Sequence, residues 1–210
     1  MLISLEGLEG CGKSTQQKRI LDYLERRGMA ARGFVDPGRT PLGEAIREIL
    51  LSPESSLGDL SELFLFAVAR RQLIRECIRP ALARGEVVVL DRYYDSTTAY
   101  QGFGRGIDMT LVEEIHREVV GPTRPELTLI FDVDPEVGLG RTRGKHKPNA
   151  TNGQLDRIEA SGLDFLRRVR EGYLAIAAAE PERCVVIPVV GDEDEVFARV
   201  QPVLSRRLDK

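Results

Sequence analysis

The 210-residue sequence contains no tryptophan, only two histidines and only three cysteines. Cys11, Cys77 and Cys184 are odd in number, lie far apart and form no C-x-x-C pair, which argues against a disulfide framework and a zinc site. No apolar run approaches the length that spans a bilayer, and the first ten residues carry two glutamates instead of the basic segment of an export signal. We therefore expect a cytoplasmic protein with no membrane partner.

Charge and composition place the chain among ordinary globular proteins. Its 30 basic and 33 acidic side chains leave a formal net charge of −3, which argues against general adhesion to nucleic acid or to anionic membranes. A hydrophobic fraction of 42% excludes an intrinsically disordered chain. Because one core suffices at this length, we expect a single domain over residues 1–210.

Apolar runs and helical periodicity alternate along the chain. Short runs of apolar β-formers, typical of strands covered on both faces, predict strands at 2–6, 87–90, 127–131 and 184–187. Helices are predicted at 14–27, 42–51, 59–82, 109–119, 135–141, 163–179 and 193–208, and Pro80 is expected to bend or restart the third of them. This alternation predicts an open, mostly parallel α/β sheet flanked by helices.

A phosphate-binding loop follows the first predicted strand. The pattern G-x-x-x-x-G-K-[ST] is matched by Gly7, Leu8, Glu9, Gly10, Cys11, Gly12, Lys13 and Ser14, and Thr15 comes next. The strand before it and the helix after it favour a site for ATP over a tight structural turn. In such a loop, backbone N–H groups hold phosphate oxygens, the lysine contacts the β- and γ-phosphates, and the serine binds Mg²⁺.

Two other side chains of this loop affect its chemistry. Glu9 is unusual because a carboxylate repels phosphate, so it is expected to point away, either into solvent or toward a hydroxyl or a metal-bound water. Cys11 is expected to face the phosphates without adding charge. The loop contains no arginine, so another segment must supply one for the transferring phosphoryl group.

Asp91 stands at the carboxyl end of the predicted strand 87–90, where the aspartate of a Walker B strand lies near loop-bound Mg²⁺. Strand alternation predicts that Arg92 points to the opposite face of the backbone, where its guanidinium can hold a second phosphate. An isolated Asp-Arg pair is more often a surface ion pair, but the strand and the phosphate loop favour the functional interpretation. We expect Asp91 and Ser14 to bind the metal.

The run DRYYDSTTAYQG at 91–102 resembles the D-R-Y/H signature of the thymidylate kinase family. The loop GLEGCGKST, the segment PGRTPLGEAIREILL at 37–51 and the run LDRIE at 155–159 also resemble parts of that family, so the matches extend from residue 2 to about residue 178. The resemblance implies a P-loop NTPase fold with a five-stranded, mostly parallel sheet. It also implies transfer of the γ-phosphate of ATP to dTMP, with Mg²⁺, giving dTDP and ADP.

The resemblance implies roles for individual residues. Phe66 would stack on the thymine and Arg70 would hydrogen-bond its edge, and a spacing of four places both on one helix face. Arg92 would hold the dTMP phosphate, and Glu9 would accept a hydrogen bond from the 3′-hydroxyl. The remaining substrate residues would be Tyr100, which crowds the sugar 2′ position, Ser96, Thr97 and Gln101 around the base, and Pro37.

The missing arginine has two candidates, Arg141 and Arg143, at the start of a polar segment at about 141–155. The resemblance implies the bacterial arrangement, in which this segment is a mobile lid that closes over ATP and excludes water. Lys145 and Lys147 would extend its charge. Further on, Asp156 and Glu159 would help to position Mg²⁺ or the lid.

Two departures from the family pattern concern the site. Where the family has R-E-P-G-G-T, this chain has VDPGRT at 35–40, which loses one arginine and one glycine and gains Arg39. The lid contains the additional run KHKPNATNG. The first departure affects the monophosphate pocket, and the second leaves the catalytic lid arginine open.

Two other functions would use the same phosphate loop. A kinase for another nucleoside or nucleoside monophosphate is the nearer one, although Phe66, Arg70 and Tyr100 argue for a deoxy-pyrimidine monophosphate. A GTPase-like switch is disfavoured, because the sequence has no N-K-x-D element and Asp91-Arg92 does not begin a D-x-x-G element. Members of the family form homodimers through helices that flank the sheet, and a plausible face here carries Leu63, Phe64 and Ala67.

Overall fold

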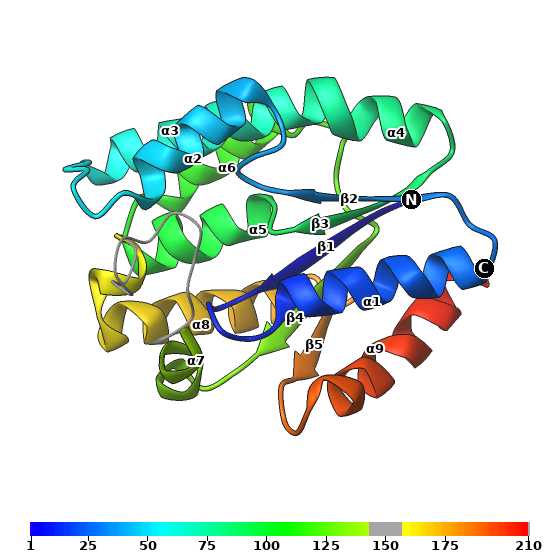
Figure 1. Ribbon diagram of the computed structural model, residues 1–210. Helices are drawn as coiled ribbons and strands as arrows, with labels where there is room; N and C mark the ends of the chain where they lie inside the picture. The colour runs from blue at the N-terminus through cyan, green and yellow to red at the C-terminus, as the bar shows by residue number, and fades with distance from the viewer. Residues whose placement is uncertain (143–156, 210) are drawn as a thin grey trace.

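A computed structural model describes residues 1–142 and 157–209, and five parallel strands form its sheet in the order β2-β3-β1-β4-β5 (Figure 1). The strands are β1 (Leu2–Gly7), β2 (Ala31–Val35), β3 (Val87–Asp91), β4 (Leu127–Asp132) and β5 (Cys184–Pro188). The four strands predicted from apolar runs are confirmed, and every pairing is parallel. The fifth, β2, is an edge strand of mostly half-buried residues, so its sequence ARGFV has no continuous apolar run.

Helices cover both faces of this sheet (Figure 1). On one face lie α1 (Lys13–Arg26), which contacts β1, β2 and β3, and α9 (Glu193–Leu208), which contacts β5 and α1. On the other lie α4 (Arg79–Ala83), α5 (Tyr94–Thr97) and α8 (Leu163–Ala179). Alternate strand residues divide accordingly: Ile3 and Val89 share a core with Ile20 of α1, whereas Leu2 and Val88 pack with Ile78.

The remaining helices are α2 (Pro41–Leu51), α3 (Asp59–Leu73), α6 (Met109–Val119) and α7 (Pro135–Thr142), with the 3-10 turn η4 (Glu159–Ser161). The predicted helix at 59–82 is helical throughout, but its turn widens into a π-helix, η1 (Ile74–Ile78), just before Pro80. A second π-helix, η2 (Thr98–Gly104), follows α5 and was not predicted. None of the described helices is both long enough and apolar enough to cross a bilayer.

The sheet brings three separated segments together at the carboxyl ends of its strands. Leu5 of β1 and Val35 of β2 both pair with Asp91, the last residue of β3. The phosphate loop after β1, the turn after β2 and the Asp91-Arg92 dipeptide therefore meet at one edge, which is where parallel α/β sheets place their ligands.

Candidate functional site

A cavity of about 460 Å³ lies at this edge. Its walls come from the phosphate loop, the turn before α2, one face of α3, the end of β3 and the α5–η2 segment. The predicted site residues that line it are Glu9, Gly10, Gly12, Lys13, Ser14, Thr15, Pro37, Phe66, Arg70, Asp91, Arg92, Ser96, Thr97, Tyr100 and Gln101. The fold thus joins the predicted phosphate site and the predicted monophosphate pocket in one space.

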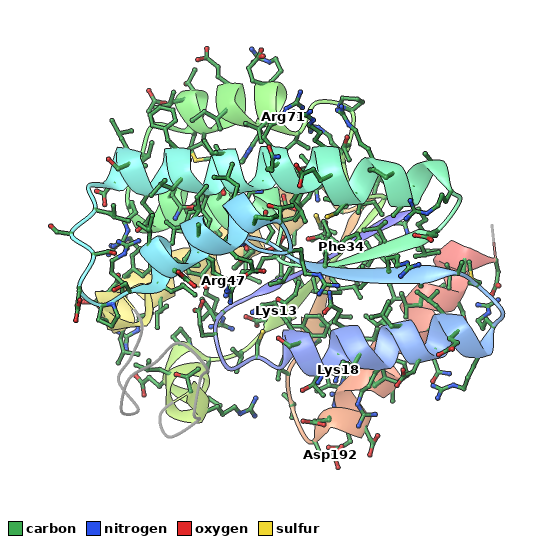
Figure 2. All side chains as sticks on the ribbon, turned by 45° about the horizontal axis from the view of Figure 1, so that its top comes forward. Lys13, Lys18, Phe34, Arg47, Arg71 and Asp192 are labelled. Carbon is green, nitrogen blue, oxygen red and sulfur yellow. The ribbon has the colours of Figure 1, made fainter. Side chains whose placement is uncertain are left out.

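The phosphate loop is shaped by its glycines. Gly10 and Gly12 have positive φ values of 73° and 89°, and a Cβ on Gly10 would lie 2.2 Å from the carbonyl oxygen of Gly138 in α7. Lys13 is buried, and its Nζ donates to the carbonyl oxygens of Gly7 and Leu8 at 2.9 and 2.8 Å. Lys13 lines the cavity. Figure 2 shows this lysine between α1 and α2.

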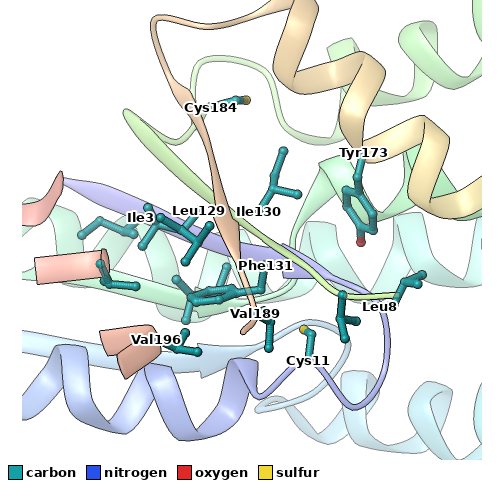
Figure 3. Packing of buried hydrophobic residues seen from close by; sticks show 14 of the residues in the cluster. Ile3, Leu8, Cys11, Leu129, Ile130, Phe131, Tyr173, Cys184, Val189 and Val196 are labelled. Carbon is teal, nitrogen blue, oxygen red and sulfur yellow. The ribbon is translucent and has the colours of Figure 1, made fainter. Parts of the chain in front are cut away.

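Cys11 does not face the cavity, and this expectation was wrong. Its side chain is 2% exposed and belongs to the main hydrophobic core, close to Leu8 and Val189 in Figure 3. The thiol lies 3.4 Å from the Lys13 ammonium. Because the backbone of the loop bends around this buried side chain, Cys11 anchors the loop to the core, and only its backbone can serve a phosphate.

Ser14 and Asp91 meet as predicted, and the Ser14 hydroxyl donates to Oδ2 of Asp91 at 2.6 Å. Among the described residues there is no group of three or more histidines, cysteines and acids that could enclose a metal ion. A cation at this point would take one hydroxyl and one carboxylate from the chain and its other ligands from water or phosphate. That donor set fits Mg²⁺, which keeps several waters and favours oxygen ligands.

Arg92 lines the same cavity as Asp91, and the two side chains point in different directions as predicted: Asp91 bonds to α1, whereas Arg92 reaches α8 on the other face of the sheet. Its φ of 71° is left-handed, so the alternation of β3 ends at Asp91. The guanidinium reaches Oε1 of Glu9 at 2.5 Å and the hydroxyl of Tyr100 at 3.1 Å. It also contacts Tyr173 at 3.2 Å, a residue of α8 that no sequence motif indicates.

Glu9 turns away from the phosphate loop toward Arg92. Its Oε2 also accepts a hydrogen bond from the Tyr100 hydroxyl at 2.8 Å. Burial favours the protonated acid, but the charges of Arg92 and Lys13 outweigh it and hold the pKa of Glu9 below its usual value. The carboxylate is therefore ionised and bonded within the cavity, which removes the solvent-facing alternative.

Arg70 is buried and paired. Its Nε donates to Oδ2 of Asp36 at 2.5 Å, and its Nη1 donates to Oγ1 of Thr97 at 2.8 Å. Its Nη2 has no hydrogen-bond partner among the described residues and belongs to a side chain that lines the cavity. Phe66, one turn earlier on α3, lines the same wall. A flat ring with acceptor atoms would fit between them.

The turn at 35–40 and the helix α2 after it contribute two residues, Asp36 and Arg47, to which no role was assigned from the sequence. Asp36 fixes Arg70, and burial raises the pKa of this carboxyl despite the opposing charge of Arg70. Arg47, on α2, donates to the carbonyl oxygen of Pro37 at 2.8 Å and lines the cavity with Lys13 (Figure 2). The substituted residue Arg39 is exposed and does not line it. Arg47 was detectable only as part of the run at 37–51.

Several predicted residues are not brought to the cavity. Gly7 and Leu8 form the inner side of the loop, and Arg141 lies exposed in the last turn of α7. The rest of the expected lid, with Arg143, Lys145, Lys147 and Asp156, lies outside the described residues. Glu159 is the first residue of η4, and its side chain also lies outside the described part of the chain. The catalytic arginine therefore stays a prediction.

Known proteins resemble this chain over nearly its whole length. The sequence profile of the thymidylate kinase family matches residues 5–200. The thymidylate kinase of Deinococcus radiodurans is 44% identical, over 99% of this chain and 97% of that protein, and that of Desulforapulum autotrophicum is 45% identical, over 99% and 92%. The crystal structure of thymidylate kinase from Ehrlichia chaffeensis matches with a TM-score of 0.77 and 33% identity, over 98% of both chains.

Proposed function

This chain belongs to the thymidylate kinase family, and we propose that its cavity binds dTMP beside ATP and transfers the γ-phosphate in line, giving dTDP and ADP for dTTP synthesis. One observation carries the proposal: a phosphate loop and a pocket lined by an aromatic ring and arginines share one cavity. We infer a single kinase domain over residues 1–210.

On the donor side, the loop supplies backbone N–H groups and the positive end of α1 to the ATP phosphates. Lys13 would exchange its two carbonyl acceptors for phosphate oxygens, which bind an ammonium more strongly because they are charged. Ser14 and Asp91 would hold Mg²⁺, which when bound neutralises charge on the β- and γ-phosphates.

On the acceptor side, the thymine would lie against Phe66, and the Nη2 of Arg70 would donate to its edge. Asp36 and Thr97 hold the other two nitrogens of Arg70, so the guanidinium is already oriented. Gln101 is held in turn, because its Nε2 donates to the buried Glu62 at 2.7 Å. The base pocket is therefore preorganised, which lowers the entropy cost of binding.

The sugar and phosphate of dTMP would occupy the Glu9, Tyr100 and Arg92 cluster. The fork of Arg92 matches the geometry of a phosphate, and Arg47 adds a second positive charge to the same cavity. Glu9 accepts from Tyr100 now and would accept from the 3′-hydroxyl, while the Tyr100 ring would exclude a 2′-hydroxyl. These groups select a deoxynucleoside monophosphate.

The reaction needs positioning and charge neutralisation more than proton transfer. The acceptor phosphate is ionised at neutral pH, so no general base is required and no covalent enzyme intermediate is formed. Arg141 or Arg143 would reach the transferring group when the lid closes. The cytoplasm remains the predicted location.

A substrate panel tests the function. Purified protein with Mg-ATP is supplied with dTMP, dUMP, UMP, dCMP, dGMP, thymidine or no acceptor, and ADP formation is measured. The proposal expects strong preference for dTMP. Equal activity on another monophosphate would overturn the base and sugar assignments, and equal ADP formation without any acceptor would favour a nucleotide-hydrolysing switch.

We also propose a homodimer through α3 and α6. Phe64 is 50% exposed and Val68 48% exposed, and together with Ile115 of α6 they line an apolar groove of about 470 Å³. Ala67 lies in the same groove, but Leu63 is 0% exposed and packs inside the chain, so its assignment to this face was wrong. A second copy of the chain would cover these side chains.

Light scattering after gel filtration tests the dimer. Phe64→Glu is expected to give a monomer, and Val137→Glu, at a 46% exposed position on α7, serves as the control that stays dimeric. A wild-type protein that elutes as a monomer would overturn the proposal.

A further inference from the structure

A second groove lies between α6, α8 and the segment 94–104 that forms α5 and η2. Its volume is about 490 Å³, within the range of small-molecule sites. Apolar side chains line it, among them Phe103 from η2 and Ile176 from α8. It uses a different face of α6 from the proposed dimer groove, so a dimer through α3 leaves it open.

Two polar groups at this groove lack partners. The hydroxyl of Tyr94 and Nδ1 of His116 are buried and have no hydrogen-bond partner among the described residues. Both side chains line the groove and are 4% and 5% exposed. A buried polar group without a partner costs about 1–3 kcal/mol, so a ligand that supplies an acceptor or a donor here gains affinity. The ring of His116 is neutral, because burial lowers its pKa to about 3.

The charge left uncompensated at the groove is positive. Arg117 and Arg124 line it, and neither has a carboxylate within ion-pair distance in the described part of the chain. The guanidinium of Arg124 lies 5.7 Å from the centre of the Tyr94 ring. Two of the acids that line the groove, Asp95 and Glu180, are bound by Arg183, although Glu180 also interacts with the charge of Arg124. Glu113 is the remaining acid of the described lining, so the two arginines outnumber the carboxylates that are not held in an ion pair.

The groove shares a wall with the nucleotide cavity. Within the segment 94–104, Tyr94, Thr98 and Phe103 line the groove, whereas Thr97, Tyr100 and Gln101 line the cavity. Most of this wall is the π-helix η2, a form that occurs mostly at functional sites. Any shift of the wall that a ligand in the groove favours also moves side chains proposed to contact dTMP.

We propose that this groove is a second small-molecule site for a flat aromatic anion, and that its occupation changes the affinity for dTMP through the segment 94–104. The apolar walls would hold the ring, and Arg117 and Arg124 would hold the anionic group. Tyr94 and His116 would bond polar atoms of the ligand. The effect on dTMP rests on the proposed function, whereas the existence of the site does not.

The probe for this test is 8-anilinonaphthalene-1-sulfonate, an aromatic anion whose fluorescence reports binding. It is titrated into protein saturated with dTMP and ADP, which do not react with each other and keep the probe out of the nucleotide cavity. Ala179→Trp fills the groove and is expected to weaken binding at least about tenfold, whereas Leu174→Trp, on the same helix outside the groove, is expected to leave it unchanged. Equal binding of the probe by the two variants would mean that it binds elsewhere on the protein as an adventitious additive only, and this result would overturn the site.

Tyr94→Phe gives a second test that does not disturb packing. Because the hydroxyl lacks a partner, its removal is expected to leave the Tm unchanged or higher and to weaken the probe several-fold. Tyr93→Phe is the control: its hydroxyl donates to Thr123 at 2.9 Å, so it is expected to lower the Tm and leave the probe affinity unchanged. A Tyr94→Phe variant that binds the probe as wild type does would contradict the assigned contacts.

The effect on dTMP is measured by titrating dTMP with and without saturating probe. Its dissociation constant is expected to change several-fold, and dTMP is expected to change that of the probe by the same factor. An unchanged value would overturn the coupling. Failure of dTMP to bind would instead overturn the proposed function, and the comparison of Ala179→Trp with Leu174→Trp would still decide the site.

Discussion

The donor and acceptor halves of the nucleotide cavity are built in different ways. The proposed donor half is mainly one continuous loop, which would hold phosphate mostly through backbone N–H groups, with Asp91 added from β3. The acceptor half takes Phe66, Arg70, Arg92 and Tyr100 from separate elements and holds them with the ion pairs Arg70–Asp36 and Arg92–Glu9. A site made by backbone is visible in a short motif, whereas a site made by side chains depends on how the whole sheet assembles.

The two halves should also fail differently when they are altered. In the donor half, the hydrogen bonds of Lys13 within the described part of the chain all go to its own loop, so its loss removes charge from the site but no long-range contact seen there. In the acceptor half, the functional arginines also join α3, the turn after β2 and α5. Changes there should therefore affect stability as well as substrate affinity.

The largest effect is expected from the lid arginines, which would complete the donor half. Arg141→Ala or Arg143→Ala should lower kcat by about 10³ to 10⁵-fold for the residue that reaches the transferring group, with the KM for dTMP nearly unchanged. Steady-state kinetics of both variants measure this, with Lys145→Ala as the control. An unchanged kcat in both arginine variants would remove the lid from the mechanism.

Arg70→Ala should cost the acceptor half both binding and stability. The pair with Asp36 is 2% and 0% exposed, so the change leaves a buried charge uncompensated and should lower the free energy of unfolding by about 3–5 kcal/mol. Arg19→Ala, which breaks an exposed pair with Asp194, is the control and should cost less than about 1 kcal/mol.

Urea unfolding measures both variants. Adding Asp36→Asn to Arg70→Ala should restore part of the stability without restoring dTMP affinity. Equal losses in the Arg70 and Arg19 variants would contradict the view that the acceptor half also supports the fold.

Two arginines have a left-handed backbone, one inside the cavity and one outside it, so substituting each with glycine distinguishes an effect on function from the relief of backbone strain. Arg92 and Arg39 have φ values of 71° and 66°, a conformation that favours glycine by about 1 kcal/mol. Arg39→Gly should raise the free energy of unfolding by about that amount and leave activity unchanged, because Arg39 is exposed and outside the cavity.

Arg92→Gly would relieve the same strain but also removes the ion-pair partner of Glu9, so the free energy of unfolding is not expected to rise. The change should lower kcat/KM for dTMP by about 10²-fold or more, since a charge-assisted contact to phosphate is lost. Kinetics and urea unfolding of the two variants check both expectations. Wild-type kinetics for Arg92→Gly would exclude Arg92 from the acceptor half.

A pH-dependent effect concerns the wall behind the acceptor half. Burial lowers the pKa of His116 to about 3, below the usual 6.5, so the unfolded chain binds one more proton between these values. The stability that the neutral ring contributes is present above pH 6.5 and is lost as the pH falls. From pH 7.5 to 5.5, wild type should lose about 1.4 kcal/mol more than His116→Gln. Parallel pH profiles would contradict this.

Local sequence patterns predicted the sheet and most helices because each strand other than β2 is buried and apolar. They did not predict β2, whose Arg32 is exposed, or η2, where polar site residues interrupt any helical period. Both elements form because of what packs against them: α1 against β2, and α8 against η2. These are long-range contacts that no short window contains.

Within the site, the motif predicted which residues form the phosphate loop but not the direction of each side chain. Cys11 turns into the core, an outcome that depends on how the loop packs against neighbouring elements, and the left-handed backbone of Arg92 was likewise not visible in the motif. The acceptor residues Phe66 and Arg70 were predicted from the family resemblance, since alone they suggest a core ring and a surface charge. Tyr173 was missed because it joins the site from α8, 81 residues after Arg92, and Arg47 was missed because nothing in the run at 37–51 distinguishes it from a surface arginine.

The measurement that tests the acceptor half most directly is calorimetric titration of dTMP and of thymidine into wild type and Arg92→Gln. If Arg92 holds the monophosphate, wild type binds dTMP far more tightly than thymidine, and Arg92→Gln loses most of that difference while its thymidine affinity stays the same. An equal dTMP-to-thymidine ratio in the two proteins would contradict the assignment of this cavity to a thymidylate.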